Sequence, residues 1–155
     1  MIFEIRVAME NDLDTIVEFN KAMALETENK ILPHDKIYYG VKNILENPSL
    51  SFYIVADNDE KIIASLMITT EWSDWRNGLF WWIQSVYVIP EFRRKGVYRQ
   101  MYSFIKTMAN SVPEICGFRL YVEKENVTAQ NTYKSLGMTE TNYKLYEELK
   151  PTEEE

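Results

Sequence analysis

One run of the sequence, "LFWWIQSVYVIP" at residues 79–90, is almost continuously apolar and rich in aromatic and β-branched residues. Successive side chains of a strand point to opposite faces, so a strand with this composition needs apolar cover on both faces. Pro90 ends the run, because proline cannot donate a hydrogen bond to a neighbouring strand. The run therefore predicts a central strand of an α/β domain.

Apolar spacing in the rest of the chain predicts the elements around this run. The 155 residues suit one domain, and we expect a single domain over 1–150 with an acidic tail at 151–155. In chain order the expected elements are a strand at 2–7, a helix from Asn11 or Asp12, a helix at 35–46, hairpin strands at 51–57 and 61–72, the run at 79–90, a helix from Gly96 to about Asn110, a strand at 116–123, a short helix ended by Gly137, and a last strand at 142–149.

Composition excludes several classes of protein. A formal net charge of −7 argues against a general nucleic-acid binder, which needs a broad basic surface. Cys116 is the only cysteine and lies in an apolar setting, so we expect a small buried side chain and no intramolecular disulfide. His34 is the only histidine, which disfavours a transition-metal site and a triad of the Ser-His type. The chain shows no signal peptide and no stretch of membrane length, so we expect a cytoplasmic protein.

A basic turn follows the central run. Arg93, Arg94 and Lys95 precede Gly96, and Arg99 comes next, so four of the 17 Lys and Arg fall within seven residues. A helix that begins after a glycine turn presents unpaired N–H groups and the positive end of its dipole, an arrangement that suits phosphate. A solvated surface turn is the alternative. The turn matches neither the nucleotide-triphosphate loop nor the triple-glycine dinucleotide turn.

Two segments resemble the GNAT superfamily of N-acetyltransferases. The first, "VYVIPEFRRKGVYRQMY", is similar to its acetyl-CoA-binding signature: Arg93 and Gly96 match, and Tyr98 stands where a second small residue is usual. The second, "LYVEKENVTAQNTYKSLGM", matches at Asn126, Tyr133 and the Leu-Gly pair before Met138. The two segments occur in the order of the family.

The resemblance implies a GNAT fold, in which a mixed twisted sheet flanked by helices binds CoA between two splayed parallel strands. Main-chain groups of the central run would hold pantetheine and the basic turn would hold the pyrophosphate. The implied cofactor-binding residues are Val86, Tyr87, Val88, Arg93, Arg94, Lys95, Gly96, Val97, Tyr98, Arg99 and Asn126. Core packing for the valines and helix capping for Asn126 are the alternative roles.

The resemblance also implies direct transfer of acetyl from acetyl-CoA to a primary amine of a small molecule or peptide. Tyr133 would protonate the departing thiolate, although it could instead be a core aromatic residue. For the base, Glu71, Glu26, Glu28 and water stay open, and each carboxylate could equally be a solvated surface group. No metal is expected to take part.

Tryptophans suggest where the amine would bind. Indole rings attract cations and stack on aromatic groups, and four Trp lie within eleven residues. We regard Glu26, Trp82 and Gln84 as weak acceptor-site residues; core packing, or an interface such as a homodimer, is the alternative. Strict alternation predicts one face with Trp82, Gln84, Val86 and Val88 and the other with Trp81, Ile83, Ser85 and Tyr87.

Two rival functions remain at this point. A non-catalytic acyl-CoA-binding regulatory module would keep the cofactor cradle without a working amine site. A protein-interaction domain would use Trp72 and Trp75 as a contact surface. The expected partners are acetyl-CoA and an amine acceptor, with no nucleic acid and no membrane.

Overall fold

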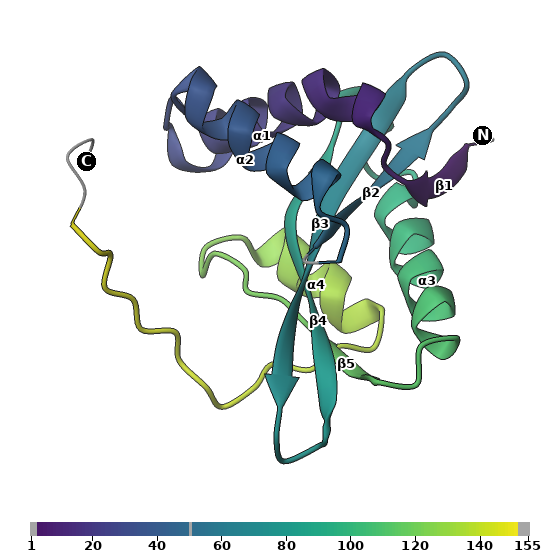
Figure 1. Cartoon of the computed structure of the whole chain (residues 1–155), viewed down its shortest axis with the longest axis vertical. Helices are drawn as coiled ribbons and strands as arrows, with labels where there is room; N and C mark the ends of the chain where they lie inside the picture. Colours follow the sequence, from purple (N-terminus) through teal and green to yellow (C-terminus); the bar gives the residue numbers. More distant parts are fainter. Residues whose placement is uncertain (1–2, 50, 152–155) are drawn as a thin grey trace. The chain divides into compact units, whose positions relative to one another are not determined.

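The computed structural model describes residues 3–49 and 51–151 (Figure 1). The chain divides into two compact units, Met1–Tyr121 and Val122–Glu155, which are treated separately below. The single domain expected over residues 1–150 stays a prediction. Of the expected acidic tail, only Pro151 lies among the described residues.

The first unit contains a mixed five-stranded sheet. Its strands follow the order of the chain, and every neighbouring pair is antiparallel except the last, which is parallel. The run that opened the sequence analysis becomes an interior strand with neighbours on both sides, as predicted. The strands are β1 (Glu4–Val7), β2 (Phe52–Asp57), β3 (Ile62–Ser73), β4 (Gly78–Val88) and β5 (Ile115–Arg119).

Three helices of this unit cover both faces of the sheet: α1 (Leu13–Glu28), α2 (His34–Glu46) and α3 (Val97–Asn110). Ile16 of α1 and Val41 of α2 are fully buried and share one core cluster with Val55 of β2. On the other face, Tyr102 of α3 meets the ring of Phe118 on β5 edge-on, with centroids 5.9 Å apart. The sheet is therefore sandwiched, as the composition of β4 requires.

A short 3-10 turn, η1 (Glu10–Asp12), leads into α1 and is fixed to the sheet by charge. The Asp12 carboxylate accepts a hydrogen bond from the Met9 N–H at 2.8 Å and pairs with Arg6 of β1 at 2.9 Å. Arg6 also pairs with Asp57 of β2 at 3.2 Å. These bonds hold the start of α1 over the edge of the sheet.

A β-bulge interrupts β4 and corrects one prediction. Gln84 lies opposite Met67, but Tyr87 lies opposite Ser65, so β4 has one extra residue between them, and Ser85 there has a φ of +53°. Strict alternation ignores such a residue. Tyr87 therefore shares the face of Gln84 and Trp82, and Val88 shares the opposite face with Ile83 and Trp81; the predicted faces of Tyr87 and Val88 were wrong.

The second unit contains α4 (Val127–Ser135), which ends near Gly137, whose φ is +98°. The strand expected at 116–123 is shorter than predicted and stops at Arg119. The last strand expected at 142–149 was also wrong: none of the described residues after α4 belongs to a strand, and Figure 1 draws them as a plain trace. An alternating apolar pattern cannot make a strand without a hydrogen-bonding partner.

Candidate functional site

The parallel strands β4 and β5 pair over only part of their length. Their ladder begins at Leu79 opposite Ile115 and ends at Trp82 opposite Arg119, whereas β4 continues to Val88. Over 83–88, no strand within the described residues pairs with β4 on this side. Backbone N–H and C=O groups on such an open edge can bind an extended ligand that carries amide groups.

The turn after β4 has an unusual backbone. A 3-10 turn, η2 (Pro90–Phe92), is followed by two left-handed residues, Arg94 with a φ of +63° and Gly96 with a φ of +79°. Turns that include left-handed residues can gather successive N–H groups into a concave anion site. No side chain caps α3, whose first backbone hydrogen bond runs from the Gln100 N–H to the Gly96 carbonyl at 3.1 Å. The predicted phosphate turn therefore has suitable backbone geometry.

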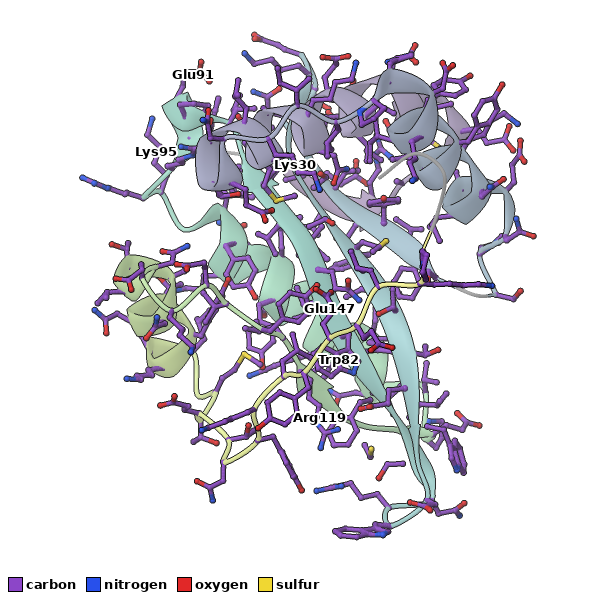
Figure 2. The ribbon with its side chains drawn as sticks, turned by 90° about the vertical axis from the view of Figure 1, so that its left-hand side faces the viewer. Lys30, Trp82, Glu91, Lys95, Arg119 and Glu147 are labelled. Atoms are coloured by element: carbon purple, nitrogen blue, oxygen red, sulfur yellow. The ribbon has the colours of Figure 1, made fainter. Side chains whose placement is uncertain are left out.

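The four cations of this turn do not act alike. Arg93 donates to the Val88 carbonyl at 2.8 Å, pairs with Glu26 of α1 at 2.9 Å and lies over the Tyr87 ring. Arg94, Lys95 and Arg99 are exposed and make no ion pair within the described residues. Lys95 lies 5.4 Å from the Phe92 ring centroid, and its side chain projects from the turn in Figure 2. Arg93 thus anchors the turn, and the other three cations are available to a ligand.

Tyr98, the residue that departs from the family signature, packs along α3. Its ring stacks on that of Tyr102 one helical turn later, with centroids 6.2 Å apart and planes 6° apart. The Tyr98 side chain is thus packed along its own helix, so its ring does not have to occupy the space in which the basic turn would bind an anion.

A second cluster of side chains lies where the β4–β5 ladder ends. Glu71 of β3 accepts hydrogen bonds from Arg119 at 2.7 Å and from the Trp82 indole N–H at 3.2 Å. The Arg119 guanidinium lies 3.7 Å from the Phe80 ring centroid, and the Tyr121 ring lies 6.1 Å from that of Trp82. Figure 2 labels Trp82 and Arg119 on adjacent strands. The Glu71 carboxylate, whose charge is partly neutralised by Arg119, therefore lies beside the aromatic ring of Trp82.

Polar contacts continue along this face of β4 toward α1. The Gln84 side-chain amide donates to the Thr69 hydroxyl at 2.6 Å, and the Tyr87 hydroxyl donates to Glu26 at 3.3 Å. Burial and the nearby Glu26 carboxylate raise the pKa of Tyr87. The predicted acceptor residues Trp82 and Gln84 thus lie on one face, and Glu26 reaches it through Tyr87. The side chain of Glu28, the last residue of α1, is exposed and makes no hydrogen bond or ion pair within the described ranges.

The second unit carries the two remaining predicted residues on α4. Asn126 caps this helix, because its side-chain oxygen accepts a hydrogen bond from the Ala129 N–H at 3.1 Å. Asn126 therefore has the helix-capping role that was the alternative to cofactor binding. Tyr133 is half-buried, and burial raises the pKa of its phenol.

A family model described as "Acetyltransferase (GNAT) family" matches residues 14–138. The chain belongs to the GNAT acetyltransferase family. It is therefore an acyltransferase, and the mixed sheet with its splayed parallel pair is the GNAT fold, as predicted. Among the rival functions, family membership favours the enzyme.

Solved structures agree with this assignment. A possible acetyltransferase from Clostridium difficile 630 is 47% identical, with a TM-score of 0.90 and coverage of 98% of this chain and 100% of that one. A predicted acetyltransferase with acetyl-CoA, from Clostridium acetobutylicum, is 22% identical, with a TM-score of 0.79 and coverage of 95% and 96%. AAC(6')-Iy, in complex with the bisubstrate analog CoA-S-monomethyl-acetylneamine, is 16% identical, with a TM-score of 0.77 and coverage of 97% and 100%. The last two share the fold. No curated protein matches the chain.

Sequence reasoning missed Arg119 and Tyr121 in this GNAT protein. An arginine inside an apolar strand, in "GFRLY", was the available signal. Among the described residues, no group of His, Cys, Asp and Glu is placed to hold a metal. None of the helices in these residues combines the length and the apolar character needed to cross a membrane.

A hollow of about 690 Å³ lies elsewhere, beside Arg6, Asp12 and Asp57. Those three side chains already pair with one another. The open edge of β4 and the basic turn are therefore the better candidate for the site of this GNAT protein.

Proposed function

We propose that this acyltransferase transfers acetyl from acetyl-CoA directly to a primary amine of a small molecule or peptide. The observation that carries the proposal is the open edge of β4 leading into the basic turn. Pantetheine contains two amides and ends at a diphosphate, so it matches an unpaired strand edge followed by an anion site. In this arrangement the main chain of Val86, Tyr87 and Val88 binds pantetheine.

The diphosphate binds at the start of α3 in this proposal. The N–H groups of Val97, Tyr98 and Arg99 and the turn around Gly96 face it, and the exposed side chains of Arg94, Lys95 and Arg99 add charge. Arg93 keeps the turn in place through Val88 and Glu26. Asn126, whose oxygen caps α4, contacts pantetheine through its amide nitrogen.

Tyr133 assists the departure of CoA. The amine nitrogen attacks the thioester carbonyl, the C–N bond forms, the C–S bond breaks, and sulfur leaves with the electron pair. A thiol has a pKa of about 8.5 and a tyrosine about 10, and burial raises the pKa of Tyr133 further. Full proton transfer from the phenol is therefore unfavourable by itself. Tyr133 stabilises the thiolate with a strong hydrogen bond, and the proton lost by the amine balances the reaction.

The acceptor amine lies on the face of β4 that carries Trp82 and Gln84. Trp82 supplies an aromatic surface for a cation, and Glu71, hydrogen-bonded to it, supplies negative charge. Glu26 lies farther along the same face, beyond Tyr87. The amine loses its proton to Glu71, to Glu26 or through water.

The test combines CoA binding with turnover. Acetyl-CoA should raise the melting temperature of the chain, and a panel of primary amines should release free CoA thiol. Tyr133→Phe should lower kcat by about 10²-fold or more, the usual contribution of a positioned hydrogen-bond donor to a developing negative charge, with the acetyl-CoA Kd nearly unchanged. Tyr39→Phe, an exposed site on α2, is the control. Equal turnover of Tyr133→Phe and the native chain would exclude Tyr133 from the mechanism.

A further inference from the structure

The Glu71 carboxylate is held by only one of its two oxygens. Its Oε1 atom accepts a hydrogen bond from Arg119 Nη1 at 2.7 Å and another from the Trp82 indole N–H at 3.2 Å. Its Oε2 atom accepts no hydrogen bond from any residue that the structure describes. Two donors from neighbouring strands restrict the rotation of the Glu71 side chain, so they also fix where Oε2 lies.

Packing within the sheet holds Arg119 in turn. The β4–β5 ladder places Arg119 opposite Trp82 and Gly117 opposite Phe80 (Figure 2). The Arg119 guanidinium lies 3.7 Å from the centroid of the Phe80 ring, whose face attracts a cation. That ring lies against the backbone of Gly117, where an added Cβ would come within 2.8 Å of it. Cys116, one residue before Gly117, is exposed, contrary to the buried position expected from its apolar neighbours.

The contact between Arg119 and Glu71 is a single hydrogen bond. Arginine and carboxylate groups frequently pair through two parallel hydrogen bonds, which is the stronger arrangement. The side chains of Arg119 and Glu71 are 25% and 45% exposed, and ion pairs that are open to water contribute little to stability. The single contact leaves Oε2 able to accept a hydrogen bond, which suits a carboxylate that binds a ligand better than one that only stabilises the sheet.

We propose that Arg119 is a positioning residue of the acceptor site. Together with the Trp82 indole it holds Oε1 of Glu71, so that Oε2 receives the ammonium group of the acceptor amine beside the aromatic ring of Trp82. The proposal rests on the acetyl transfer proposed above and concerns the amine alone, because Arg119 acts on the acceptor through Glu71. Its loss should therefore raise the KM for the amine without changing the acetyl-CoA Kd.

Steady-state kinetics at saturating acetyl-CoA, with a primary amine that the native chain acetylates, give the first test. Arg119→Gln should raise the amine KM about tenfold, since the Glu71 carboxylate loses a charge-assisted hydrogen bond, and kcat should change less than KM does. Arg119→Lys keeps a charged donor and should restore part of the loss. Arg76→Gln is the matched control and should leave the KM unchanged, because the Arg76 guanidinium also lies over the Phe80 ring, 5.0 Å from its centroid, but donates to Ser73. A native KM in Arg119→Gln would overturn the proposal.

A double-mutant cycle separates positioning from direct contact with the amine. In a chain that already carries Glu71→Gln, adding Arg119→Gln should cause little further rise in the KM, because Arg119 acts only through the Glu71 carboxylate. A second rise of about the same size as the first would show that Arg119 acts on the amine by itself, and the positioning role would be wrong. The melting temperature of each variant should stay close to the native value, because the ion pair is partly exposed.

A measurement without turnover distinguishes the failure of this proposal from the failure of the proposed function. The Trp82 indole N–H shares Oε1 of Glu71 with Arg119, and its NMR signal can be assigned by its loss in Trp82→Phe. The chemical shift of this signal should move in Arg119→Gln and stay in place in Arg76→Gln. If no amine is acetylated while the shift moves as expected, the proposed acetyl transfer is wrong and the positioning of Glu71 stands. An unmoved shift in Arg119→Gln overturns the positioning whatever the turnover.

Discussion

Replacing Gly96 with aspartate tests where the diphosphate of CoA binds. Gly96 has a φ of +79°, and a Cβ added there meets no atom within 4 Å. Among residues with a side chain, Asn and Asp tolerate this left-handed conformation best. Gly96→Asn and Gly96→Asp thus introduce nearly the same shape and backbone cost, and they differ by one negative charge.

The expected size of the charge effect follows from Coulomb's law. For a carboxylate about 6 Å from a diphosphate with two negative charges, an effective dielectric constant of about 40 to 80 gives roughly 1.5 to 3 kcal/mol of repulsion. This energy corresponds to an acetyl-CoA Kd about 10- to 100-fold higher for Gly96→Asp than for Gly96→Asn. The difference should shrink with added salt, because residue 96 is exposed.

Isothermal titration calorimetry with acetyl-CoA at low and high salt measures this difference directly. The two variants should have the same melting temperature, which separates binding from folding. Equal Kd values for Gly96→Asp and Gly96→Asn at low salt would show that the diphosphate is not held at this turn. The proposed use of the start of α3 would then be wrong.

Two further predictions concern other parts of the chain. Glu71→Gln should raise the KM for the amine about tenfold or more, since it removes a charged hydrogen-bond partner. The melting temperature should change little, because the ion pair between Glu71 and Arg119 is partly exposed. An unchanged KM would exclude Glu71 from the acceptor site. Burial raises the pKa of Tyr53 to about 12, so between pH 10 and 12 the unfolded phenol ionises while the native one keeps its proton. The free energy of unfolding should therefore fall by about 2 kcal/mol over this range, and urea titrations should show a weaker fall for Tyr53→Phe than for the native chain.

The sequence predicted those parts of the site that are formed by residues contiguous in the chain. The composition of β4, the proline that follows it and the basic turn with Gly96 are contiguous features, and the corresponding strand, turn and helix formed where expected. The pairing of Glu71 with Arg119 was not predictable in this way, because these residues lie 48 positions apart and meet only through the β3–β4–β5 register. The absence of a strand at 142–149 has a related cause, since a strand depends on its partner as well as on its own pattern.

The bulge at Ser85 connects the two halves of the candidate site. Without the extra residue, Tyr87 would point to the face of α3, away from Glu26. With it, the Tyr87 phenol reaches Glu26, and Glu26 in turn binds the Arg93 guanidinium. Arg93 also donates a hydrogen bond to the Val88 carbonyl on β4. The turn is therefore joined to the strand by a side chain whose charge is already paired with that of Glu26. A single irregularity in β4 therefore orients the face proposed for the amine and also anchors the turn, which leaves the remaining cations exposed at the proposed diphosphate site.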